Sequence, residues 1–237
     1  MSGHNKWSQI KHKKAKEDSK KGKAFTKLIK EITMSARSHG GDPANNAHLR
    51  LLLEKGKEIN MPLDNAKRAI QRGTGELPGA HYESIRYEGY GPHGVAIIVD
   101  CLSDNRNRTV ASLRKIFSTH NGNLGETGVV SWMFNQCGVI RTKKPYTEDD
   151  LLDMLMDYTI EDIITDEDSA TILCAQKELD AVKQTLTKHK VALESSELEW
   201  IAKDKVDLSD EQSEQVVALL TELDDNEDVQ QVYSTLA

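Results

Sequence analysis

The strongest chemical signal in the sequence is a cluster of lysines at its N-terminal end. The first thirty residues contain ten lysines and two acidic residues, Glu17 and Asp18, although the whole chain has a formal net charge of -7. Lysine ammonium groups neutralise phosphates without strict geometric demands, so this cluster is typical of a protein that binds a polyanion. The alternative is a solvated lysine tail that binds nothing.

We predict that this basic end binds nucleic acid through its phosphates. Trp7 lies among the lysines, where an indole ring can stack on an unpaired base, and packing against the rest of the protein is its alternative role. Arginines farther along the chain are secondary candidates because guanidinium groups suit phosphate oxygens. The predicted nucleic-acid-binding residues are Lys6, Trp7, Lys11, Lys13, Lys14, Lys20, Lys21, Lys23, Lys27, Arg68, Arg72, Arg106 and Arg108.

The motif SDNRNRT at residues 103–109 follows an apolar strand pattern and precedes a helical one. A helix N-terminus with two nearby arginines can bind an anion. The same residues can instead form a capping loop whose arginines pair with carboxylates of the domain itself. The sequence leaves these two interpretations equal.

Two glycine-rich motifs have mainly structural interpretations. YEGYGPHG at residues 87–94 predicts a turn, with close approach to a ligand as the alternative. NGNLGETGVVSWMF at residues 121–134 predicts a loop and then a strand. Trp132 and Phe134 are two residues apart and would share one strand face, which we expect to be buried rather than to stack on RNA.

No pattern of residues indicates catalysis. The sequence has no GxxxxGK(S/T), HExxH or GxSxG motif, and its eight histidines are scattered without metal-ligand spacing. Cys101, Cys137 and Cys174 lack a CxxC pattern and are expected to be buried thiols of a reducing compartment. We therefore predict a protein that is not an enzyme and that has no catalytic residue, no metal site and no cofactor.

Charge divides the chain into two parts. Residues 1–75 contain 17 Lys and Arg and 7 Asp and Glu, a net charge of +10, so the remainder has a net charge of -17. This asymmetry predicts one polyanion-binding domain joined to acidic domains. The sequence has no run of eighteen apolar residues and no apolar leader, so we expect a cytoplasmic protein without membrane contact, and a monomer.

Helical periodicity dominates the basic part. Phe25, Leu28, Ile29 and Ile32 form one apolar face, while Lys27, Lys30 and Arg37 lie off it. Two further helical patterns end at about residues 59 and 73, so the sequence predicts a small bundle with a basic exterior. A glycine-rich linker at 73–94 then leads into alternating patterns. The predicted strands are 95–102, 129–134, 138–143, 161–166, 170–175, 191–195, 198–203 and 228–233.

This order predicts an α+β fold: an N-terminal three-helix basic bundle followed by two ferredoxin-like βαββαβ domains, the second inserted in the first. The expected domains are 1–75, the basic helical nucleic-acid-binding domain; 76–135 plus 197–237, an α/β domain; and 136–196, the inserted α/β domain. An insertion at a hairpin tip disturbs little buried backbone. Two α/β domains in simple tandem are the alternative.

Several of these motifs together closely resemble the YebC/PmpR family, which includes the mitochondrial translational activator of cytochrome c oxidase subunit I. They are GHNKWSQIKHKKAKEDSKKGKAFTKLIKEI, GGDPANNAHLR, YEGYGPHGVAIIVDCLSDNRNRTV, NGNLGETGVVSWMF and DVQQVY. The resemblance covers nearly the whole chain and implies three domains, the first of them helical.

The resemblance implies two different functions. Bacterial members are described as probable DNA-binding transcriptional regulatory proteins, which is the function we expect. The alternative is a ribosome-associated translation factor that binds ribosomal RNA and eases synthesis of proline-rich stretches. The expected partner is accordingly nucleic acid, either DNA or ribosomal RNA, with the ribosome as a further partner in the second case.

Overall fold

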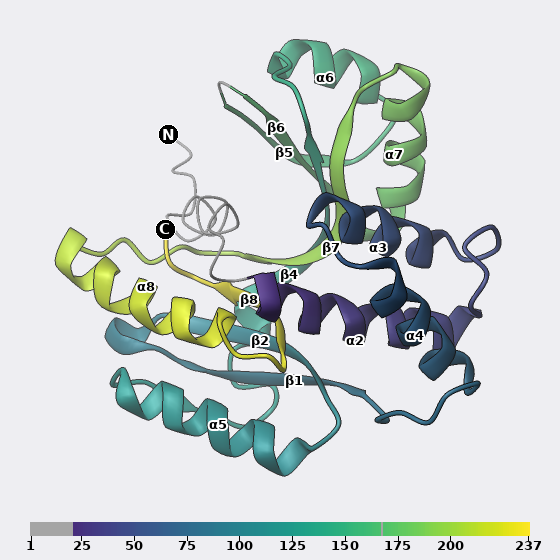
Figure 1. The fold of residues 1–237 in the computed structure, drawn as a ribbon. Coiled ribbons are helices and arrows are strands. Elements are labelled where there is room, and N and C mark those ends of the chain that lie inside the picture. Colours follow the sequence, from purple (N-terminus) through teal and green to yellow (C-terminus); the bar gives the residue numbers. More distant parts are fainter. Residues whose placement is uncertain (1–20, 167) are drawn as a thin grey trace. The chain divides into compact units, whose positions relative to one another are not determined.

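The computed structural model describes residues 21–166 and 168–237. These residues form two compact units, one made of 21–131 with 205–237 and the other of residues from 132 to 204 (Figure 1). Helices come first, and two four-stranded antiparallel sheets follow. The predicted α+β fold class is confirmed.

Three helices begin the described chain: α2 (Lys21–His39), α3 (Ala47–Glu58) and α4 (Leu63–Thr74). Their apolar faces meet in one small core, in which Ile32, Leu49 and Ala69 have no exposed surface. Asn46 caps α3, because its side chain accepts a hydrogen bond of 2.9 Å from the backbone N–H of Leu49. The 3.6-residue period of the sequence therefore predicted this region correctly.

Helices α2 and α4 cross closely because residue 73 has no side chain. A Cβ atom at Gly73 would lie 2.4 Å from the Thr33 carbonyl oxygen and 2.8 Å from the Ala36 Cβ. We expect Gly73→Ala to force the two helices apart and to lower the free energy of unfolding of this region by about 1–3 kcal/mol. Denaturant unfolding followed by circular dichroism measures this change.

Gly22→Ala is the matched control for Gly73→Ala. Gly22 also lies in a described helix, but a Cβ there would meet no atom within 4 Å. Alanine at this exposed helical position should raise stability by about 0.5–1 kcal/mol. If both substitutions were equally harmless, close helix packing would not explain the glycine at residue 73.

The first sheet has the strand order β3 (Asn123–Leu124), β1 (Glu83–Tyr90), β2 (Ala96–Ser103), β8 (Val229–Ser234). Helices α5 (Arg106–Thr119) and α8 (Asp210–Asp224) share a core with its strands (Figure 1). Phe117 of α5, Leu219 of α8 and Ile97 of β2 are completely buried there.

One of the two strands that flank β2 differs from the prediction. This neighbour is β1, which pairs with β2 along its whole length, from Glu83 opposite Ser103 to Tyr90 opposite Ala96. The sequence had placed these residues in a linker and had expected 198–203 in this sheet. The reason is chemical: two of the three buried positions of β1 are Glu88 and Gly89, which produce no apolar alternation.

The second sheet has the order β5 (Ile160–Thr165), β6 (Ala170–Ala175), β4 (Phe134–Thr142), β7 (Leu193–Ala202). Helices α6 (Glu148–Leu155) and α7 (Leu179–Lys188) pack on it around a second core. The chain order β4-α6-β5-β6-α7-β7 with this sheet order is ferredoxin-like.

The first and the last strand of the second sheet in chain order, β4 and β7, differ from the prediction. Residues 129–133 form a turn and a short 3-10 segment rather than a strand, and β4 starts at Phe134. The strands predicted at 191–195 and 198–203 are one strand, β7. The compact unit consequently extends beyond the expected limits of 136 and 196.

Candidate nucleic-acid interface

The predicted nucleic-acid-binding residues fall into three groups. The first group lies outside the described residues and stays a prediction: Lys6, Trp7, Lys11, Lys13, Lys14 and Lys20. Lys21 is the first residue of α2, and its side chain belongs to the same group. The second group is exposed to solvent and consists of Lys23 on α2, Arg68 and Arg72 on α4, and Arg106 on α5. The third group, Lys27 and Arg108, contacts carboxylates.

Lys27 ties α2 to the end of α8. Its Nζ lies 2.5 Å from the carbonyl oxygen of Asp224 and 3.5 Å from that residue's carboxylate, and both side chains are 18% exposed. A cation at the C-terminal end of a helix also interacts favourably with the helix dipole. A nucleic-acid phosphate would have to compete with these contacts.

Lys30 is buried, although the sequence placed it on the basic exterior. Its side chain is 7% exposed, and Nζ donates to Asp228 Oδ1 at 2.6 Å, to the Glu227 carbonyl oxygen at 2.9 Å and to the Leu102 carbonyl oxygen at 3.2 Å. An ammonium group has three donors, so all of them have oxygen partners here. Lys30 thus holds α2 against the first sheet and is not a candidate phosphate contact.

The carboxylate of Asp228 is the centre of this buried network. Besides Lys30, Thr109 Oγ1 donates to it at 2.7 Å, and Arg108 Nη2 lies 3.1 Å from Oδ2. Burial alone would raise the pKa of Asp228, but the hydrogen bonds from Lys30, Thr109 and Arg108 outweigh it and hold the pKa below its ordinary value.

The SDNRNRT motif acts as a helix cap in the structure. The side chain of Asn105 accepts a 3.0 Å hydrogen bond from the backbone N–H of Arg108, at the start of α5. The Arg108 guanidinium also contacts Asp104 at 2.8 Å. These contacts match the capping interpretation for Arg108, while Arg106 is exposed at the first position of the helix.

The YEGYGPHG motif forms the hairpin turn between β1 and β2. The N–H of Gly91 donates to the Val95 carbonyl oxygen at 2.8 Å, and His93 Nε2 lies 2.8 Å from Gln215 Oε1 of α8. Tyr87 is buried in the core of the sheet, and Tyr90 donates to the Val129 carbonyl oxygen at 3.3 Å. The structural role predicted for this motif therefore has direct contacts to support it.

Glu88 organises the loop that follows β3. Its carboxylate is buried and accepts hydrogen bonds from the backbone N–H groups of Gly128 at 2.9 Å, Val130 at 2.8 Å and Ser131 at 2.8 Å. Burial alone would raise the pKa of Glu88, but these three donors stabilise the carboxylate and lower the pKa.

The depressed pKa values of Glu88 and Asp228 predict loss of stability in acid. A carboxyl whose pKa is lower in the folded protein contributes stability above its unfolded-state pKa of about 4, and this contribution disappears as the pH falls through the folded-state value. We expect the melting temperature to fall steadily below about pH 4. Thermal unfolding between about pH 2 and 7 measures it, and Glu88→Gln should flatten the slope. An unchanged slope in that variant would contradict the role of Glu88.

Trp132 and Phe134 do not share a strand face. Trp132 lies in the 3-10 segment Ser131–Met133, where it is 66% exposed, whereas Phe134 begins β4 and is buried. The expectation that both rings are buried was wrong for Trp132, because the chain turns before β4 begins.

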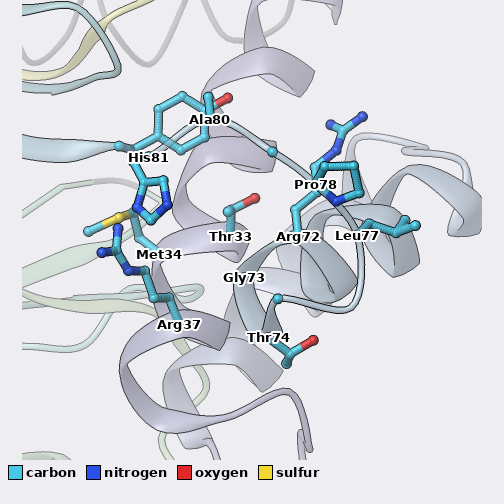
Figure 2. A pocket seen from close by; sticks show the side chains of 13 residues that line it. Thr33, Met34, Arg37, Arg72, Gly73, Thr74, Leu77, Pro78, Ala80 and His81 are labelled. Atoms are coloured by element: carbon cyan, nitrogen blue, oxygen red, sulfur yellow. The ribbon is translucent and has the colours of Figure 1, made fainter.

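A cavity of about 380 Å³ lies beside the basic helices (Figure 2). It is bordered by the C-terminal half of α2, the end of α4 and the segment 77–82. Arg72 comes from the predicted set, whereas His81 and Tyr82 were missed because they lie in the predicted linker. Within residues 21–166 and 168–237, no cluster of His, Cys, Asp or Glu could hold a metal ion, and no helix is long and apolar enough to cross a membrane.

Comparisons with known proteins match almost the whole chain to one family. Residues 5–76 match the TACO1/YebC protein N-terminal domain, and residues 82–236 match the TACO1/YebC second and third domain. A probable transcriptional regulatory protein of Desulfosudis oleivorans is 48% identical over 99% of this chain and 96% of its own length. One of Persephonella marina is 50% identical over 99% and 95%. The crystal structure of a conserved hypothetical protein from Aquifex aeolicus has a TM-score of 0.83 at 39% identity, covering 94% of this chain and 93% of that one.

Proposed function

Because the chain belongs to the TACO1/YebC family, as its sequence motifs predicted, we propose that it is a DNA-binding transcriptional regulatory protein without enzymatic activity. Its relatives in Desulfosudis oleivorans and Persephonella marina are named probable transcriptional regulatory proteins. In this proposal the basic N-terminal part binds the phosphate backbone, and the acidic remainder faces solvent or protein partners.

The observation that carries the proposal is the concentration of positive charge on residues 1–75. The exposed cations among the described residues there are Lys23, Arg37, Arg50, Lys55, Lys57, Lys67, Arg68 and Arg72. Exposed cations on one domain bind any phosphate backbone and release its counterions, which gives affinity that falls steeply with salt. Lys27 and Lys30 stabilise the fold instead, so the interface is smaller than the sequence alone suggests.

Action on the ribosome is the second candidate, and one feature of α4 favours it. A recognition helix presents its N-terminal residues to base edges in the major groove. The first two residues of α4, Leu63 and Asp64, are exposed and are not typical donors to guanine or adenine, and Asn65, which could read adenine, is only partly exposed.

Crosslinking in cells, followed by sequencing of both the DNA and the RNA recovered with the tagged protein, decides between these functions. Enrichment of discrete promoter fragments supports transcriptional regulation. Recovery of discrete ribosomal RNA positions with little DNA overturns it in favour of the second candidate. Recovery of neither nucleic acid above an untagged control overturns both.

A further inference from the structure

The cavity beside α2 and α4 combines an apolar wall with a cationic rim (Figure 2). Met34, Leu77, Pro78 and the ring of Tyr82 provide the apolar surface. Arg37 and His81 lie together on one side, and Arg72 lies on the other beside Pro78. Its volume is at the small end of the range for ligand pockets, where a single nucleotide fits.

The two arginines of the rim have no carboxylate partner among the described residues. This distinguishes them from Arg86, Arg108 and Arg141, each of which pairs with an Asp or Glu of its own unit. Arg37 and Arg72 are also exposed. Their guanidinium groups are therefore available to an anion from outside the protein, for which phosphate is a well-matched geometry.

Gly79, in the segment 77–82 that borders the cavity, packs against the side chain of Arg72. A Cβ atom at Gly79 would lie 3.0 Å from Arg72 Cγ, 3.1 Å from Cβ and 3.2 Å from Cδ, so the aliphatic stem of Arg72 packs directly against the glycine. The buried Lys30 Nζ lies 5.6 Å from the centroid of the Tyr82 ring, a cation–π contact between this ring and α2. These two contacts place the stem of Arg72 and the ring of Tyr82 at the cavity.

We propose that this cavity binds one unstacked nucleotide of a nucleic-acid chain. The base lies against Tyr82 and the neighbouring apolar side chains, and the phosphates on either side of that nucleotide meet Arg37 and Arg72. Unpaired bases characteristically stack on aromatic side chains with arginine at the backbone. Arginines on opposite sides of a cavity suit a nucleotide within a chain, which carries a phosphate at each end. The inference rests on the proposed nucleic-acid binding and narrows it.

The test compares two labelled probes by fluorescence anisotropy with the full-length protein. One is a perfectly paired duplex, and the other is the same duplex with a single extrahelical nucleotide, each made as DNA and as RNA. Arg37→Ala and Arg72→Ala should each weaken binding of the bulged probe by about tenfold or more. Arg114→Ala is the matched control, because it removes the same charge from an exposed arginine of α5 that lies outside the cavity and outside the predicted binding residues, and thermal melts check that all variants fold.

The outcomes separate the cavity from the general function. Loss of affinity for the bulged probe in the two cavity variants, but not in Arg114→Ala, supports the site. Replacing the extrahelical nucleotide by an abasic unit should then remove the wild-type preference. Equal, small losses for both probes in all three variants overturn the site and leave nucleic-acid binding intact. Failure of the wild-type protein to bind either probe overturns both.

Discussion

Charge reversal of Lys11, Lys13 and Lys14 to glutamate is expected to weaken binding to nucleic acid by roughly two orders of magnitude or more at physiological salt. Each phosphate contact that is lost removes about 0.9 from the slope of log affinity against log salt on duplex DNA, and about 0.7 on single strands. Three lost contacts should thus reduce the slope by about 2–3. Titration of a labelled duplex at four or five salt concentrations measures both quantities.

The matched control reverses the charge of three lysines outside the basic N-terminal part. Lys115, Lys177 and Lys188 are exposed and lie outside residues 1–75, so their reversal changes the net charge by the same amount. If the basic end is the binding site, this control should lose little affinity and keep the wild-type slope. Equal losses in both triple variants would mean that total charge, rather than a defined interface, governs binding.

The helical part of the fold was predictable because its information is local. Apolar residues at helical spacing produced α2, α3 and α4 within a few residues of their observed bounds. Lys27 and Lys30 show the limit of this approach. Both lie off the apolar face, but their partners Asp224 and Asp228 are almost two hundred residues away in sequence. Nothing local indicates that these two lysines stabilise the fold while Lys23 is exposed.

Two of the strand errors, the missed β1 and the strand predicted at 129–134, share one physical cause. Glu88 makes β1 look polar, and its carboxylate binds the backbone N–H groups of Val130 and Ser131. Those two donors are no longer available to a strand ladder, and residues 129–133 form a turn and a short 3-10 segment before β4. A single buried carboxylate therefore reversed both assignments, and a pattern of apolar residues cannot reveal it.

Only part of the candidate nucleic-acid site could be predicted from the sequence. Composition identified the basic end and the exposed arginines of α4, because charge is visible without knowledge of the fold. The cavity required Arg37 and Arg72 to come from different helices and His81 and Tyr82 from the segment after them. Only the close crossing at Gly73 and the return of the chain along α4 bring these residues together.

Asp228→Ala is expected to lower the free energy of unfolding by about 3–5 kcal/mol. It would leave the ammonium group of Lys30 buried without its carboxylate, and it would remove the acceptor for Thr109 Oγ1. Desolvating an uncompensated charge costs far more than the net gain of the original pair. Denaturant unfolding measures the loss, and hydrogen exchange of α2 amides should show that α2 opens first.

Asp104→Ala provides the control on the same network. Asp104 contacts Arg108 from a position that is 36% exposed, and Arg108 retains Asp228 as a partner, so the loss should stay within about 1 kcal/mol. Similar losses of stability for Asp104→Ala and Asp228→Ala would contradict the idea that the buried Asp228 carboxylate stabilises the fold through its contact with Lys30. The reason for the difference can be tested separately with Lys30→Met in combination with Asp228→Asn. This pair removes both charges but keeps an acceptor for Thr109, so it should recover a large part of the stability that Asp228→Ala loses, because the cost comes from the unpaired charge rather than from a missing attraction.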